Sequence, residues 1–395
     1  MRDARPASGK IGALDGYRGL AAAMIVVYHT YEYSMDWHPR YQREFSGLAH
    51  PVAMLFQNLD VGVSLFFVLS GALLFRPFAR SLLDASSLPS IRAFFRRRVL
   101  RIVPVYYVAL LVLWPFTALG RPDAWCDLVE HLTFTHIFDM PHVTDIIGVE
   151  WSLADEMIYY LFIGVFGVVV ARFCRRLATP AARFRLLAGL LAAGAMIGAA
   201  YRFWCAATNP TSTWGTFNPL SRFDAFAFGM LVALVAARWP GLVAGRTPAI
   251  VLRAGGFALI VVAMALRSAT WAMYLYVHSL ASAGFALILL VSVAGPATAP
   301  WERFFGSRPL GWLGAISYSL YLWHLSILLA ASHGPIALTP PAFGRNVAIE
   351  FALALAVATV SYRLIERPAL RLRYRAAPIA RPAPAGGGAA PAPGD

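Results

Sequence analysis

The chain has 395 residues, of which 59% are hydrophobic and only 14% are charged, and its formal net charge is +14. Soluble domains carry about 25% charged residues, so this composition excludes a soluble globular protein and indicates many membrane-spanning helices. A strongly basic soluble protein would suggest a nucleic-acid partner. Here the arginines cluster between apolar segments, and we predict no nucleic-acid partner.

The apolar runs predict an all-α fold: a polytopic membrane helical bundle of about ten transmembrane helices in the cell inner (plasma) membrane. Most of the 34 Lys and Arg residues lie in alternate connections, and the positive-inside rule then makes both termini cytoplasmic. We expect a membrane domain over 1–375 and a disordered Pro/Ala/Gly-rich cytoplasmic tail over 376–395. The predicted spans are 17–34, 56–75, 99–118, 149–171, 185–203, 222–238, 250–267, 273–294, 312–332 and 346–364.

The first predicted span carries an arginine and a histidine that share one helix face. Eleven residues separate Arg18 from His29, which corresponds to about three helical turns and roughly 16 Å along the axis. Arg18 would lie near a membrane surface and His29 deep in the hydrocarbon, where an ionisable side chain is costly and is a functional candidate. The pair suits a co-substrate that is anionic at one end and reactive at the other.

A cluster of arginines opens the third predicted span. Arg98 and Arg101 are three residues apart, so they share a helix face and can form a fork for phosphate. The alternative is a stop-transfer and headgroup anchor, which explains many such clusters. The spacing alone leaves both interpretations open.

Later spans add further polar candidates. Glu156 lies a turn and a half inside the fourth span. The helix dipole favours carboxylates mainly in the first turn, so it accounts less well for a glutamate at this depth. A buried glutamate can orient a histidine or bind sugar hydroxyls. Arg222 and Asp224 open the sixth span, where they either pair with each other or line a polar cavity. Tyr321 and His324 lie three residues apart on one stripe of the ninth span.

The three cysteines form no CxxC motif, and we predict no metal site. We favour free thiols over a disulfide between Cys126 and Cys205, both of which can face outward.

Seven segments occur in order: LDGYRGLAA…VVYH, FFVLSGALLF, RRRVLRIVPVYY, WSLADEMIYYL, RFDAFAFG, ISYSLYLWH and SYRLIERP. Together they resemble the acyltransferase-3 family of integral membrane O-acyltransferases, which modify bacterial surface glycans, macrolides and related acceptors. The resemblance covers about residues 11–372. The family's Arg–His pair matches Arg18 and His29, and its RxxR donor motif matches Arg98 and Arg101. Its WSLxxE glutamate matches Glu156, and its SYxxYLxH histidine matches His324. Some relatives carry a fused SGNH hydrolase-like domain, which we do not find in this sequence.

The resemblance implies a membrane O-acyltransferase that moves an acyl group, most commonly acetyl, from cytoplasmic acyl-CoA to a hydroxyl of a cell-surface or exported glycan or glycosylated metabolite. Acyl-CoA would be a co-substrate, with no tightly bound cofactor. The other expected partners are the lipid bilayer and a glycan, lipid-linked sugar or macrolide-type acceptor. The predicted catalytic residues are His29, Glu156 and His324, and the predicted binding residues are Arg18, Arg98, Arg101, Arg222, Asp224 and Tyr321.

Two questions stay open at this point. Transfer could be direct, or it could pass through an acyl-enzyme on His29. The alternative function is a transporter that moves a small anion or sugar through the same polar bundle, although transporters more often show repeat symmetry and broken helices, and neither is evident in the sequence.

Overall fold

The computed structural model describes residues 9–35, 55–209, 214–267, 271–296, 299–331 and 340–372, and the regular structure of these residues is entirely helical. Within them, nine helices are long and apolar enough to cross a membrane. They are α4 (Val61–Leu83), α5 (Ile91–Thr117), α7 (Trp151–Cys174), α8 (Pro180–Thr208), α10 (Pro219–Arg238), α11 (Arg246–Arg267), α12 (Trp271–Ala294), α14 (Arg308–Ala331) and α15 (Pro340–Ser361). The predicted all-α, multi-pass bundle is confirmed.

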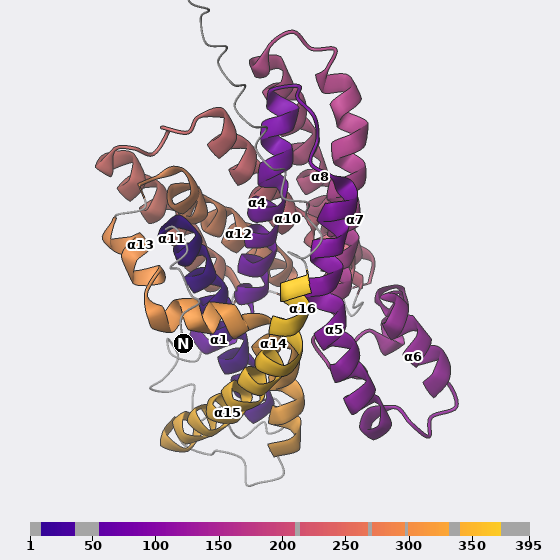
Figure 1. Ribbon diagram of the computed structural model, residues 1–395. Helices are drawn as coiled ribbons and strands as arrows, with labels where there is room; N and C mark the ends of the chain where they lie inside the picture. Colours follow the sequence, from indigo (N-terminus) through magenta and orange to yellow (C-terminus); the bar gives the residue numbers. More distant parts are fainter. Residues whose placement is uncertain are drawn as a thin grey trace, which may run out of the picture.

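The first predicted span is α1 (Gly9–Met35), a 27-residue helix. It is not among those nine helices, and it carries Asp15, Arg18, His29 and Glu32. It packs in the bundle against α14 and α4 (Figure 1), so its polar residues face protein. The cytoplasmic placement of both termini stays a prediction, and the tail over 376–395 lies outside the described residues.

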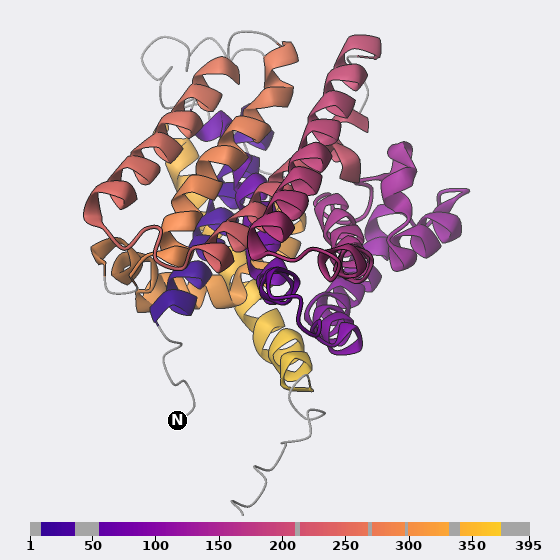
Figure 2. The same cartoon turned by 90° about the horizontal axis from the view of Figure 1, so that it is seen from above.

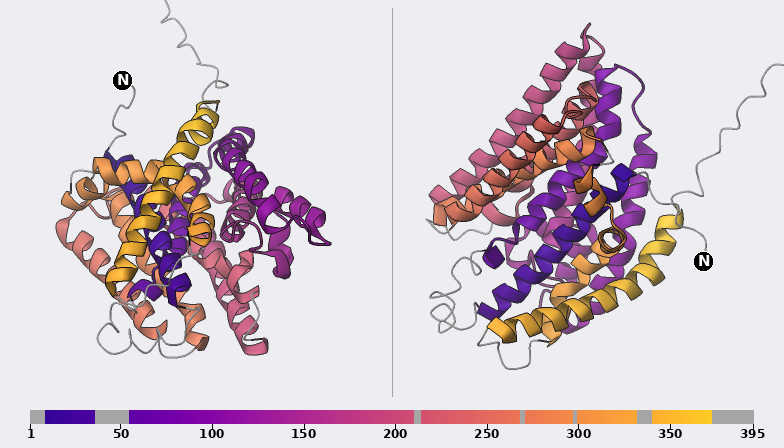
Figure 3. Two further views of the ribbon diagram at one scale, coloured as in Figure 1. Left: turned by 90° about the horizontal axis from the view of Figure 1, so that it is seen from below. Right: turned by 90° about the vertical axis from the view of Figure 1, so that its left-hand side faces the viewer.

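The bundle is layered around α4. Helix α4 contacts α10, α1, α12 and α7, while α11 and α12 form a pair at one edge and α6 (Ala124–Thr133) lies at the opposite edge (Figure 2). Helix α15 runs along α14 and α1 (Figure 3). The sequence predicts only a connection between α5 and α7, but the structure places there α6 and two short helical turns, η1 (His136–Phe138) and η2 (Met140–His142).

Close helix contacts require glycine at two crossings. A Cβ on Gly71 of α4 would lie 2.2 Å from the carbonyl oxygen of Phe226 in α10. A Cβ on Gly314 of α14 would lie 1.9 Å from the carbonyl oxygen of Asp15 in α1. Small residues let membrane helices approach to backbone contact, and here the second crossing brings α1 and α14 together along the length that carries the candidate histidines.

Two helix boundaries differ from the prediction. Helix α5 begins at Ile91, where the side chain of Ser90 accepts a hydrogen bond from the amide of Ala93. The arginines predicted to open the span therefore lie about two turns inside the helix. The last predicted span, 346–364, continues through a π-helical turn, η3 (Tyr362–Glu366), into α16 (Arg367–Leu372). Such turns accommodate a residue like Pro368, which lacks a backbone donor.

The π-helical turn points a carboxylate into the bundle. Glu366 is buried and accepts a hydrogen bond of 2.7 Å from Ser319 of α14, while Arg363 and Arg367 are exposed. The cysteines are free thiols: Cys126 is exposed, whereas Cys174 and Cys205 are buried. A disulfide between Cys126 and Cys205 is therefore not formed.

Candidate active site

Three arginines from α1 and α5 line one cavity of about 70 Å³ inside the bundle. Arg18 is held by an ion pair of 3.0 Å to Asp15. The guanidinium of Arg98 lies 5.8 Å from the ring centre of Tyr160, and Arg101 follows one turn later on the same face. The structure thus brings the three predicted donor-binding residues together; their role in binding stays a prediction.

Glu156 lies in this arginine cavity and accepts a hydrogen bond of 2.7 Å from Ser70. Glu156 therefore lies with the arginines, whereas Arg222 lines a different cavity. Three arginines and one glutamate line the cavity, and Asp15 pairs with Arg18 beside it. Such a site favours a ligand with several anionic oxygens.

The two predicted histidines contact each other directly. Nδ1 of His29 lies 2.9 Å from Nε2 of His324, and Nδ1 of His324 lies 2.6 Å from the carbonyl oxygen of Tyr321. A carbonyl oxygen only accepts, so Nδ1 of His324 carries a hydrogen. In a neutral pair, Nε2 of His324 then accepts a hydrogen bond from Nδ1–H of His29.

This hydrogen-bond order leaves Nε2 of His29 without a hydrogen and therefore basic. A carboxylate oxygen of Glu32 lies 3.9 Å from that nitrogen and would stabilise it after protonation. The hydroxyl of Tyr28 donates to the other oxygen of Glu32 at 2.9 Å. The resulting unit can hold and return one proton at a defined atom. Sequence reasoning missed Glu32, although its position three residues after His29 on a helix was a readable signal.

His29 lines a second, larger cavity of about 330 Å³, here called the histidine chamber. Val63 and Tyr321 line both cavities, so they form the wall between the arginine cavity and the histidine chamber. The hydroxyl of Tyr321 lies 2.7 Å from Ser152 Oγ, which holds this wall against the start of α7. Other residues that line the chamber include Glu32, Asp60, Trp151, Phe217, Arg222, His278 and Leu325.

Arg222 and Asp224 do not act together. Arg222 lines the histidine chamber, with its guanidinium 5.6 Å from the ring centre of Trp151. Asp224 instead forms a buried ion pair of 2.5 Å with Arg202 of α8 and accepts a hydrogen bond of 2.5 Å from Ser279. The structure does not pair Asp224 with Arg222, and its role in binding substrate stays a prediction. Residues two apart on a helix point to different faces, which separates the two side chains.

The chamber also holds a histidine that the sequence analysis did not select. His278 of α12 lies 3.2 Å from Ser64 Oγ through Nδ1 and 3.5 Å from a carboxylate oxygen of Asp60 through Nε2. A buried histidine within a predicted span was the available signal. Ser64 is thus a hydrogen-bonding residue as well as a small residue at a helix contact.

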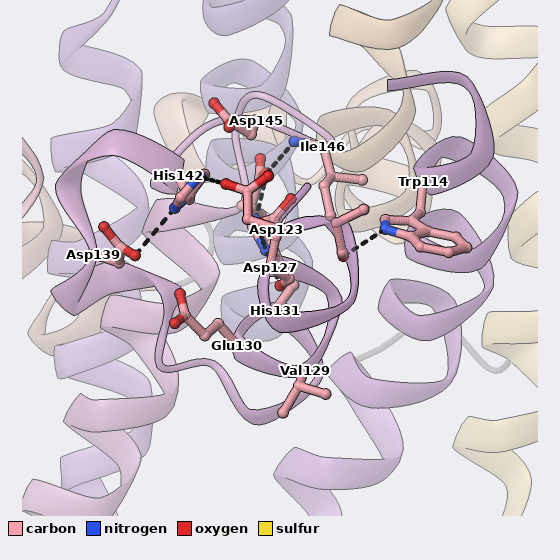
Figure 4. A network of polar contacts seen from close by, with 12 residues as sticks. Trp114, Asp123, Asp127, Val129, Glu130, His131, Asp139, His142, Asp145 and Ile146 are labelled. Atoms are coloured by element: carbon pink, nitrogen blue, oxygen red, sulfur yellow. Dashed lines mark hydrogen bonds and ion pairs between the residues drawn. The ribbon is translucent and has the colours of Figure 1, made fainter. Parts of the chain in front are cut away.

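Outside the bundle, Glu130, Asp139 and His142 are the one group of possible metal ligands within 4.8 Å of one another in the described part of the chain. His142 already lies 2.6 Å from Asp123 and 3.0 Å from Asp139, as Figure 4 shows. These His–carboxylate contacts explain the cluster without an ion. The absence of a metal stays a prediction.

Comparison with known proteins identifies the family. The family model described as an acyltransferase domain matches residues 11–362, which include every predicted site residue. The chain belongs to the acyltransferase-3 family. No solved structure matches it significantly.

The chain resembles three curated proteins over nine-tenths of its length. It is 22% identical over 385 residues to the peptidoglycan O-acetyltransferase OatA of Listeria monocytogenes, covering 91% of the chain and 55% of that protein. It is 27% identical over 382 residues to the putative membrane-bound transacylase BcsY of Komagataeibacter xylinus, covering 93% of the chain and 85% of that protein. It is 22% identical over 388 residues to the O-acetyltransferase OatA of Staphylococcus aureus, covering 92% of the chain and 58% of that protein. The chain therefore spans little more than half the length of the two OatA proteins.

Proposed function

We propose that this protein is an O-acyltransferase of the inner (plasma) membrane that transfers an acyl group, acetyl in the simplest case, from acyl-CoA to a hydroxyl of a glycan. The observation that carries the proposal is the pair of adjacent cavities, one lined by three arginines and the other by His29, which contacts His324. The names of the OatA relatives support a glycan hydroxyl as acceptor.

The arginine cavity is the proposed donor site. Planar guanidiniums bind phosphate oxygens through paired hydrogen bonds, and Arg18, Arg98 and Arg101 gather at one cavity. The pantetheine arm would run from these arginines toward the wall formed by Val63 and Tyr321. Acyl-CoA would enter from the cytoplasm, the side to which the positive-inside rule assigns the arginine cluster.

The histidine chamber is the proposed acceptor site. Nε2 of His29 takes the proton of the acceptor hydroxyl while the hydroxyl oxygen forms a bond to the thioester carbonyl carbon. The C–S bond then breaks, and the CoA thiolate leaves and receives the proton from His29. His324 accepts a hydrogen bond from the imidazolium, and Glu32 balances its charge. This direct route needs no acyl-enzyme.

The test is acceptor-dependent thiol release by the purified full chain. With acetyl-CoA and a soluble oligosaccharide, the wild-type protein should release CoA thiol and form a sugar ester, and His29→Gln should do neither. His142→Gln, which changes a histidine that lines neither cavity, is the matched control and should retain activity. Equal thiol release by His29→Gln would refute the proposal. A transporter of small anions or sugars would move its cargo without releasing thiol.

A further inference from the structure

The segment 144–149 forms part of the wall of the histidine chamber. Gly148 has φ +89°, and a Cβ there would lie 2.4 Å from Leu325, the neighbour of His324. The carbonyl oxygen of Val149 lies 3.3 Å from the hydroxyl of Tyr321, whose own carbonyl orients His324. The position of this segment is therefore coupled to the catalytic histidine pair through two contacts with α14.

Glu150 holds this segment from behind. Its side-chain Oε1 accepts hydrogen bonds from the amides of Ile146 at 3.2 Å and Ile147 at 2.9 Å. The same oxygen lies 3.2 Å from Nε2 of His131 in α6. Glu150 and His131 are both fully buried, so neither charge has solvent to stabilise it.

The contacts of His131 match an imidazolium paired with an ionised Glu150. Its Nδ1 lies 2.9 Å from the backbone oxygen of Asp127 and 2.9 Å from the Asp127 carboxylate, while Nε2 faces Glu150. Both ring nitrogens face oxygen atoms, and with Glu150 ionised both of them donate. Arg121 then binds Asp127 and, at 2.6 Å, Asp145, which fixes a second point of the segment.

We propose that Glu150 and His131 form a buried ionic clamp that holds segment 144–149 in place and thereby positions the acceptor side of the histidine chamber. Both are positioning residues, because they reach the chamber only through the backbone of this segment. The clamp itself follows from the contacts above, whereas its effect on acceptor binding rests on the proposed function.

The clamp is sensitive to pH. Burial acts to lower the pKa of His131, but the hydrogen bond and charge of Glu150, with the contacts to Asp127, outweigh it and raise the pKa above the ordinary 6.5. His136 stacks on His131 with ring centres 4.1 Å apart, and burial, with the charge of His131, lowers its pKa to about 4. His136 is therefore neutral near pH 7. Tyr106 faces His131 only through a hydrogen bond to its backbone oxygen.

The sign of the effect follows from the raised pKa. A histidine whose pKa is higher in the folded state stabilises that state fully below its unfolded pKa, and the stabilisation is lost as pH rises through the folded pKa. The clamp is thus intact below the ordinary pKa of 6.5 and releases as pH rises through the raised pKa of His131. Release should free the amides of Ile146 and Ile147 and loosen the chamber wall.

Hydrogen exchange tests the clamp without any substrate. In the detergent-solubilised wild-type chain, we expect the Ile146 and Ile147 amides, corrected for intrinsic exchange, to lose about tenfold or more protection as pH rises through the pKa of His131. His131→Gln should show low protection at every pH, and His142→Gln should behave as wild type. A wild-type protection that does not change with pH would overturn the clamp even if the variant failed to fold.

Steady-state kinetics test the positioning role. With acetyl-CoA and a chito-oligosaccharide as probes, His131→Gln should raise the KM for the oligosaccharide about fivefold or more and leave that for acetyl-CoA unchanged. An unchanged oligosaccharide KM in a variant that has lost amide protection would refute the positioning role. Absence of transfer in the wild-type protein would instead count against the proposed function, while the exchange result would still decide the clamp.

Discussion

Replacement of His324 by Phe should reduce turnover without abolishing it. The substitution removes the acceptor that lies 2.9 Å from Nδ1 of His29, so the imidazolium formed during transfer loses one hydrogen bond. A hydrogen bond to a charged group is worth about 1.5–3 kcal/mol, which corresponds to about a 10- to 150-fold loss in kcat. His29→Ala removes the base itself and should cost about 10²–10⁴-fold.

The assay is CoA thiol release with saturating acetyl-CoA and oligosaccharide. His324→Gln supplies an amide oxygen that can accept the same hydrogen bond, so it should retain more activity than His324→Phe. Because both histidines act as one unit, the double variant His29→Ala/His324→Phe should be no slower than His29→Ala. Wild-type kcat in His324→Phe, or additive losses in the double variant, would refute the assigned hydrogen-bond order.

Three further predictions follow from other parts of the structure. Arg98→Ala should raise the KM for acyl-CoA far more than the KM for the acceptor. Arg98→Lys should restore the KM for acyl-CoA only in part, because a lysine ammonium does not replace the planar guanidinium. An unchanged KM for acyl-CoA would mean that the arginine cluster only anchors the protein in the membrane. The exposed Arg80 and Phe138 can each be replaced by a single cysteine in a background without native cysteines. The two cysteines should react with an impermeant thiol reagent from opposite sides of the membrane. Labelling of both from one side would overturn the predicted topology. Arg202→Ala should destabilise the fold by about 3–5 kcal/mol, because it leaves the Asp224 carboxylate buried without its partner; an unchanged thermal unfolding temperature would contradict this.

The sequence predicts well what depends on local pattern. Apolar length and basic connections predict the helices, and the eleven-residue spacing places Arg18 and His29 on one face of α1. The three-residue spacing of Arg98 and Arg101 likewise places both at one cavity. These predictions succeed because helix periodicity is fixed by backbone geometry rather than by distant contacts.

What the sequence does not predict depends on contacts between helices. The His29–His324 hydrogen bond joins α1 and α14, and its geometry follows from the crossing at Gly314. The partner of Asp224 lies on α8 rather than two residues away. Neither contact has a local pattern, because the side chains that meet are chosen by how the helices cross.

The central claim is that acyl-CoA and a glycan hydroxyl meet at His29, and transfer of isotopically labelled acetyl is its most direct test. Proteoliposomes containing the full chain are supplied with labelled acetyl-CoA and an oligosaccharide, and the sugar is examined by mass spectrometry. We predict a base-labile acetyl ester on the oligosaccharide in an amount equal to the CoA released, and none with His29→Ala. An ester formed equally well by His29→Ala, or label that crosses the vesicle without forming an ester, would contradict the claim.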